Sequence, residues 1–171
     1  MTEVIFSTIH GSHLYGLNHP GSDIDTFTVT TSNRGARQVV AGNRDSVTIG
    51  FDAFIEYAFS GSHQSCEALF SPYKEWESHV ELKHYLDGMR VMGGDVLSKY
   101  KRTIKSFAFS DDMKKRRHAV RLWLNMQGLR VEGRFNPVMT PQERLWASNL
   151  AADLGRQELY DVLCEGESTF A

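Results

Sequence analysis

The hydrophobic pattern of this chain changes near Pro72, and that change limits the fold more than any other feature of the sequence. Before Pro72, short runs rich in β-branched residues alternate with turns; after it, apolar residues recur at helical spacing. A length of 171 residues suits one hydrophobic core better than two independent domains. We therefore predict one compact α/β (α+β) domain, with a small mixed sheet and helices in residues 1–72 and a helical part, residues 73–171, packed on them.

The first part contains four predicted strands. Residues 3–10 (EVIFSTIH) and 23–31 (DIDTFTVTT) read as single strands, and residues 37–51 as two strands joined by a turn at Gly42-Asn43. A stripe of apolar residues at helical spacing follows from Phe51 to Phe59. The order strand, short helix, strand, hairpin, helix predicts a mixed sheet covered by helices.

The second part carries clear helix boundaries. An apolar stripe runs from Val96 to Phe107, Ser110–Asp112 suits the start of the next helix, and Gly133 suits its end. Thr140-Pro141-Gln142-Glu143 is typical of a capped helix start. For that last helix we predict a buried face made of Leu145, Trp146 and Leu150.

Composition excludes several function classes. The formal net charge of −2 gives no global field for nucleic acid, so any such contact would have to be local. No signal-like start and no apolar run of about 18 residues occur, which predicts a cytoplasmic protein without a membrane segment. Cys66 and Cys164 form no spaced framework and are predicted to be reduced thiols; the segment HQSC lacks the second ligand pair of a zinc site.

The segment GSHLYG (residues 11–16) has the glycine spacing of a P-loop but not its chemistry. The two residues that follow are Leu17 and Asn18, where a P-loop has lysine and serine or threonine. The dinucleotide-binding fingerprint is missing too, because no G-x-G-x-x-G follows the strand. What remains is a strand that ends at a Gly-Ser turn, where a phosphate can approach the backbone closely.

Two aspartates open the next predicted strand. Asp23 and Asp25 stand at positions i and i+2, so their carboxylates point to the same face. Two such charges are unfavourable together unless a cation lies between them, and hard oxygen ligands select Mg²⁺ or Mn²⁺. Pro20-Gly21-Ser22-Asp23 is good turn chemistry by itself, but a turn explains neither Asp25 nor the upstream Gly-Ser.

The stretch GSHLYGLNHPGSDIDTFTV resembles the active-site signature of the DNA polymerase-β-like nucleotidyltransferase superfamily. The segments DSVTIGF, GSHQSCEALFSP and KKRRHAVRLWL follow in the order seen in the predicted nucleotidyltransferases associated with RNA repair. The resemblance spans most of residues 3–132. It implies a sheet of the polymerase-β palm type, with residues 1–72 as the catalytic core.

The resemblance also implies roles for matching residues. Gly11 and Ser12 would hold the β- and γ-phosphates of an NTP, with ATP expected, while Asp23 and Asp25 would bind the metal ions. A third carboxylate is implied on a later strand; Asp45 is the first choice because it opens the strand expected beside the first two, and Asp52 is the alternative.

The implied reaction is transfer of an NMP from the NTP to an acceptor hydroxyl, with release of pyrophosphate. An RNA 3′ end and a protein side chain are both plausible acceptors. The runner-up is a protein adenylyltransferase of the antitoxin type, and a catalytically silent nucleotide- or partner-binding module is a third reading. Base preference and oligomeric state stay open.

A basic helix is predicted after Asp112. At spacings of three, four and seven residues, one face carries Lys114, Arg117, His118 and Arg121. Such a face can be a solvated flank, but with the resemblance we interpret it as nucleotide-binding. Glu67 is interpreted as a cap or brace of the following helix, with a role in the site left open.

Overall fold

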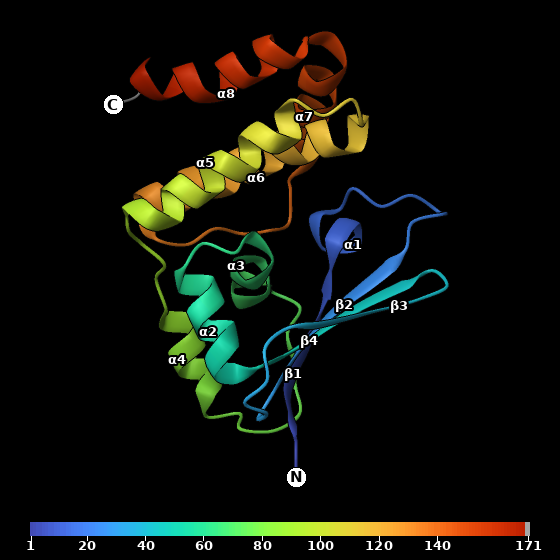
Figure 1. The fold of residues 1–171 in the computed structure, drawn as a ribbon, viewed down its shortest axis with the longest axis vertical. Helices are drawn as coiled ribbons and strands as arrows, with labels where there is room; N and C mark the ends of the chain where they lie inside the picture. The colour runs from blue at the N-terminus through green and yellow to red at the C-terminus, as the bar shows by residue number, and fades with distance from the viewer. Residues whose placement is uncertain (170–171) are drawn as a thin grey trace.

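The computed structural model describes the backbone of residues 1–169 and the side chains of residues 1–164. Within that range the chain forms a five-stranded mixed sheet and eight helices. Figure 1 shows helices α5 to α8 as a layer beyond the end of β1 where α1 lies, with α2, α3 and α4 beside the sheet. The predicted α/β class with a helical C-terminal part is confirmed.

The sheet has the strand order β3-β4-β2-β1-β5. Its strands are β1 (Val4–His10), β2 (Ile24–Thr30), β3 (Arg37–Ala41), β4 (Arg44–Gly50) and β5 (Glu75–Trp76). Strands β2 and β4 pair in parallel, whereas the other neighbours are antiparallel. The starts of β2 and β4 therefore meet at one edge of the sheet.

The helices largely follow the boundary signals in the sequence. They are α1 (Gly11–Tyr15), α2 (Phe51–Phe59), α3 (His63–Phe70), α4 (Leu82–Gly88), α5 (Gly94–Ala108), α6 (Met113–Glu132), α7 (Pro141–Asp153) and α8 (Arg156–Thr169). Asp112 caps α6 by accepting a hydrogen bond of 2.9 Å from the backbone N–H of Lys114, and Gly133 ends the helix in the left-handed region. No helix within residues 1–169 has both the length and the apolar character needed to cross a membrane.

Helix α7 begins at the predicted capping box, but its predicted buried face is confirmed only at Leu150, which is half-buried against the core, and is wrong at Leu145 and Trp146. Ala147 and Ala151 are buried, while Leu145 is 63% exposed. Small alanine side chains let α7 approach α6 closely, so larger residues lie beside the contact instead of in it. The ring of Trp146 lies at this edge, 5.7 Å from that of Trp123.

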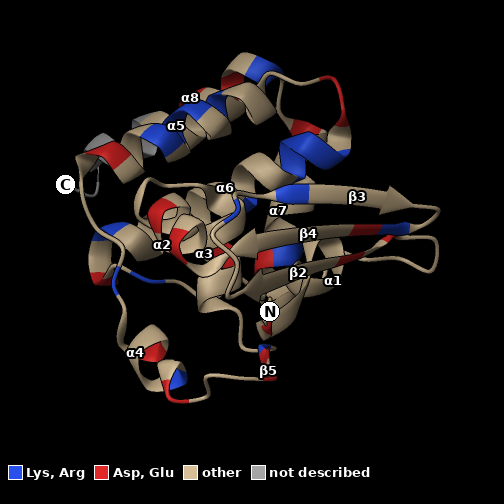
Figure 2. Ribbon diagram, turned by 60° about the horizontal axis from the view of Figure 1, so that its bottom comes forward, with Lys and Arg blue, Asp and Glu red and all other residues tan. Residues whose placement is uncertain are grey.

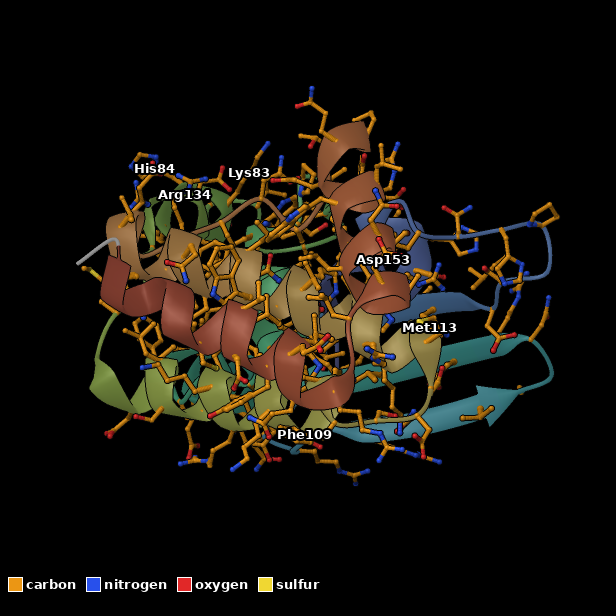
Figure 3. The ribbon with its side chains drawn as sticks, turned by 90° about the horizontal axis from the view of Figure 1, so that it is seen from above. Lys83, His84, Phe109, Met113, Arg134 and Asp153 are labelled. Carbon is orange, nitrogen blue, oxygen red and sulfur yellow. The ribbon has the colours of Figure 1, made fainter. Side chains whose placement is uncertain are left out.

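One hydrophobic core runs through both predicted parts of the chain. Phe6, Phe27 and Phe54 join the sheet to α2, with ring centroids of Phe6 and Phe54 separated by 5.7 Å. Tyr100 of α5 and Met126 of α6 belong to the same core. Figure 3, viewed from above, shows α8 as the outermost helix over this layer. The sheet and the C-terminal helices thus share one hydrophobic core.

Candidate active site

Two acidic residues lie side by side at the sheet edge where β2 and β4 begin. Asp25 pairs with Asp45 in the parallel register of these strands, and on its other side Asp25 pairs with His10. Figure 2 shows the acidic segments of the two strands next to each other. Asp52 lies in the first turn of α2, beyond the opposite end of β4. Of the two candidates for the third carboxylate, Asp45 is therefore the one beside Asp25.

The Gly-Ser turn fits closely against Asp25. Gly11 follows directly after β1 with φ of +63°, a conformation that L side chains rarely adopt. A Cβ atom at Gly11 would overlap Oδ2 of Asp25. Only glycine can occupy this position without displacing the carboxylate.

We expect Gly11→Ala to lose activity by more than backbone strain explains. The matched control is Gly42→Ala, because Gly42 has nearly the same φ (+64°) but no atom within 4 Å of its Cβ position. Both variants carry a strain cost of about 1–2 kcal/mol, measured by urea unfolding. Only Gly11→Ala should lose the activity of the site, and equal activities in the two variants would contradict the close fit.

Two neighbouring hollows bring the predicted site residues together. The first has a volume of 130 Å³ and is lined by Asp23, and the second has 180 Å³ and is lined by Asp25 and Asp45. Both are lined by Ser12, Lys114 and His118. Arg117 lines only the first hollow, and Gly11 and Arg121 only the second. The structure therefore gathers the acidic pair, the Gly-Ser turn and the basic face of α6 around one place.

The carboxylates have the properties of a cation site. Burial, followed by the charges of Asp45 and Asp23, raises the pKa of Asp25 above its usual value. Asp45 Oδ2 accepts a hydrogen bond of 2.6 Å from Gln38 Nε2, while its Oδ1 is buried and has no hydrogen-bond partner among the described side chains. A buried carboxylate oxygen without a donor is stabilised by a cation, so these residues fit a divalent metal.

The side chains are not yet arranged around an ion. No group of three or more His, Cys, Asp or Glu in the described part of the chain has a metal-binding arrangement. Gln38 already occupies one oxygen of Asp45. Mutual repulsion also favours separation of the carboxylates, so metal binding would require their side chains to turn toward one another.

Arg121 lies deeper than the rest of the basic face. It is only 2% exposed, and its Nη1 donates to Glu67 Oε1. Its Nε donates to His118 Nδ1 at 3.1 Å, and its guanidinium lies 3.7 Å from the ring centroid of Tyr15. Tyr15 in turn donates its hydroxyl hydrogen to Glu67 Oε2. The guanidinium is thus engaged within the protein, and it fixes α6 against α1 and α3.

Glu67, for which the sequence left a role in the site open, is the buried partner of Arg121. It lies inside α3, fully buried, and not at the start of a following helix. Burial favours its neutral form, but Arg121 and the nearby His63 and His10 outweigh burial and lower the pKa of Glu67 to about 2. A glutamate within the apolar run CEALF was the available signal that a buried cation faces it.

Three histidines, of which His10 is buried and His63 and His118 are half-buried, predict a loss of stability in mild acid. Burial lowers the pKa of His10, His63 and His118 below the usual 6.5, in the case of His118 to about 3. Because the unfolded chain binds these protons first, the free energy of unfolding should fall as the pH drops below about 6.5, by up to about 1.4 kcal/mol per pH unit for each histidine.

Urea unfolding at about pH 7.5, 6 and 5 measures the slope of the free energy of unfolding against pH. His118→Gln keeps an acceptor for Arg121 but does not titrate, so it should show a smaller slope than the natural chain. Identical slopes would contradict the neutral state of His118.

Several further residues line the second hollow without a sequence signal. Gln38, His63, Gln64 and Phe107 come from three different elements and face the 180 Å³ hollow that holds Asp25 and Asp45. The rings of His63 and Phe107 lie 6.3 Å apart in an edge-to-face arrangement. No short spacing in the sequence connects these positions.

Comparisons with known proteins add no family assignment. No protein-family model matches the chain, and no curated protein sequence matches it. The geometry of the carboxylates, the Gly-Ser turn and α6 therefore carries the functional argument.

Proposed function

We propose that this protein is a metal-dependent nucleotidyltransferase that transfers an NMP from an NTP, ATP in the first place, to an acceptor hydroxyl with release of pyrophosphate. The observation that carries the proposal is the pairing of Asp25 with Asp45 on parallel strands, packed against Gly11 and facing Lys114.

The triphosphate would lie in the 130 Å³ hollow. Lys114 and Arg117 supply positive charge there, and Ser12 supplies a hydroxyl. Charge-assisted hydrogen bonds from such side chains are roughly twice as strong as neutral ones. Arg121 would not bind phosphate directly, because Glu67 already neutralises it; it is a positioning residue that holds α6 over the carboxylates.

Asp23, Asp25 and Asp45 would hold Mg²⁺ or Mn²⁺. When bound, the ions stabilise negative charge on the attacking and leaving oxygens of the phosphoryl group. In the transfer itself, the acceptor oxygen forms a bond to the α-phosphorus while the bond to pyrophosphate breaks. The proton of the acceptor hydroxyl is lost in the same step, and the carboxylate of Asp45 would accept it.

The proposal is tested by asking which phosphate of ATP is transferred. The protein is incubated with Mg²⁺ and ATP labelled on either the α- or the γ-phosphate, together with total RNA and a protein extract. We expect label from the α-phosphate of ATP, and not from its γ-phosphate, to become attached to RNA or to protein through a bond that is stable in acid. Label on protein alone would identify the antitoxin-type adenylyltransferase activity.

Two outcomes would contradict the proposal. Transfer of γ-label would identify a kinase instead. Thermal stabilisation by ATP without transfer to any acceptor would identify a nucleotide-binding module.

A further inference from the structure

A second groove lies on the opposite side of the loop that joins α6 to α7. Its volume is 450 Å³, larger than the 180 Å³ of the catalytic cavity and within the usual size of small-molecule sites. Apolar side chains of Leu124, Val131, Phe135, Val138 and Met139 form part of its walls, and polar or charged side chains form the rest.

Asn125 gives this groove a polar floor. The residue is 4% exposed, and its Nδ2 has no hydrogen-bond partner among the described side chains and backbone. The buried Nε2 of Gln127, which also lines the groove, has no partner in that range either. An unpartnered buried amide destabilises the free protein, so a ligand that accepts a hydrogen bond from Asn125 would remove this penalty.

The groove is separate from the phosphate-binding hollow. The backbone N–H of Met139 donates to the carbonyl of Tyr15 at 3.1 Å, which closes the loop onto α1 between them. Arg121 lines both the groove and the catalytic cavity, so the two are in contact through one buried side chain.

The charged groups of the inner groove already have hydrogen-bond partners within the protein. Glu67 pairs with Arg121, and Glu143 Oε2 accepts from the backbone N–H of Thr140 at 2.7 Å. Arg134 and Glu132 are exposed, and Figure 3 shows Arg134 at the edge of the molecule. The interior therefore suits a neutral ligand with an apolar face and hydrogen-bonding edges.

We propose that this groove is a second ligand site that binds a purine base, with Asn125 as its anchor. A side-chain amide pairs with both N6 and N7 of adenine, which selects adenine over other bases. The apolar walls would cover the faces of the ring, and the sugar would point toward the exposed rim at Arg134. The proposal does not depend on nucleotidyl transfer.

Adenosine binding, followed by calorimetry or saturation-transfer NMR, tests this site without any phosphate group. We expect adenosine to bind more tightly than uridine, and Asn125→Leu and Asn125→Asp to weaken adenosine at least about tenfold. Phe107→Leu, on the wall of the catalytic cavity, is the matched control and should leave adenosine binding unchanged. Thermal unfolding of each variant checks that it is folded.

Three results would overturn the assignment. They are no adenosine binding to the natural chain, equal binding by the folded Asn125 variants, and loss of binding in Phe107→Leu. The last result would place adenosine in the catalytic cavity instead.

Discussion

Replacing Asp25 with asparagine is expected to lower nucleotidyl transfer at least about 1000-fold, while the protein stays folded. The substitution keeps the size of the side chain that packs against Gly11 but removes its charge. It also relieves the repulsion by Asp45 and Asp23 that raises the pKa of Asp25, so stability should be unchanged or slightly higher. The rate of α-label transfer with saturating Mg²⁺ and ATP measures the effect.

Asp52→Asn is the matched control for this prediction. Asp52 lies beyond the far end of β4, so its substitution should leave transfer within about twofold of the natural rate. Asp45→Asn should behave like Asp25→Asn, because the two residues are neighbours in the parallel register. A loss in Asp52→Asn with full activity in Asp45→Asn would reverse the choice of third carboxylate.

Replacing Glu67 with alanine is expected to destabilise the protein by about 3–5 kcal/mol. The substitution leaves the Arg121 guanidinium buried without its anion and removes the acceptor of the Tyr15 hydroxyl. Because this network joins α1, α3 and α6, the midpoint of urea unfolding should fall sharply.

An exposed arginine–carboxylate pair provides the comparison. Arg156 donates to Asp111 at the surface, and Asp111→Ala should cost at most about 1 kcal/mol because water screens that pair. The double variant Glu67→Met with Arg121→Met should recover part of the loss, since neither buried charge remains. Equal costs for Glu67→Ala and Asp111→Ala would contradict a buried ion pair.

Local chemistry explains why much of the fold could be predicted. The turn at Gly42-Asn43, the cap at Asp112 and the capping box at Thr140 each depend on a few adjacent residues. The structure has all three at the predicted places. The two-residue strand β5 could not be predicted, because it is too short to show alternation and lies after the pattern change at Pro72.

The features of the site that the sequence could not predict are the burial of individual side chains and the contacts between residues far apart in the chain. Spacing placed Arg121 on one helical face with Lys114, but only the fold shows that α3 supplies Glu67 beneath it. The position of Asp45 beside Asp25 was expected only from the resemblance, because alternation shows where a strand lies but not that β4 crosses to lie parallel to β2. The predicted burial of Leu145 and Trp146 was wrong because the size of a side chain, and not only its hydrophobicity, decides whether it fits at a close helix contact.

Metal binding tests the central claim most directly, because it needs no knowledge of the acceptor. Mn²⁺ is titrated into the protein with an ATP analogue that cannot be cleaved between its α- and β-phosphates, and the free ion is followed by electron paramagnetic resonance. We predict that the natural chain and Asp52→Asn bind Mn²⁺ in a nucleotide-dependent way and that Asp25→Asn and Asp45→Asn do not. Equal Mn²⁺ binding by all four proteins, or none by the natural chain, would contradict a metal site built from the paired carboxylates of β2 and β4.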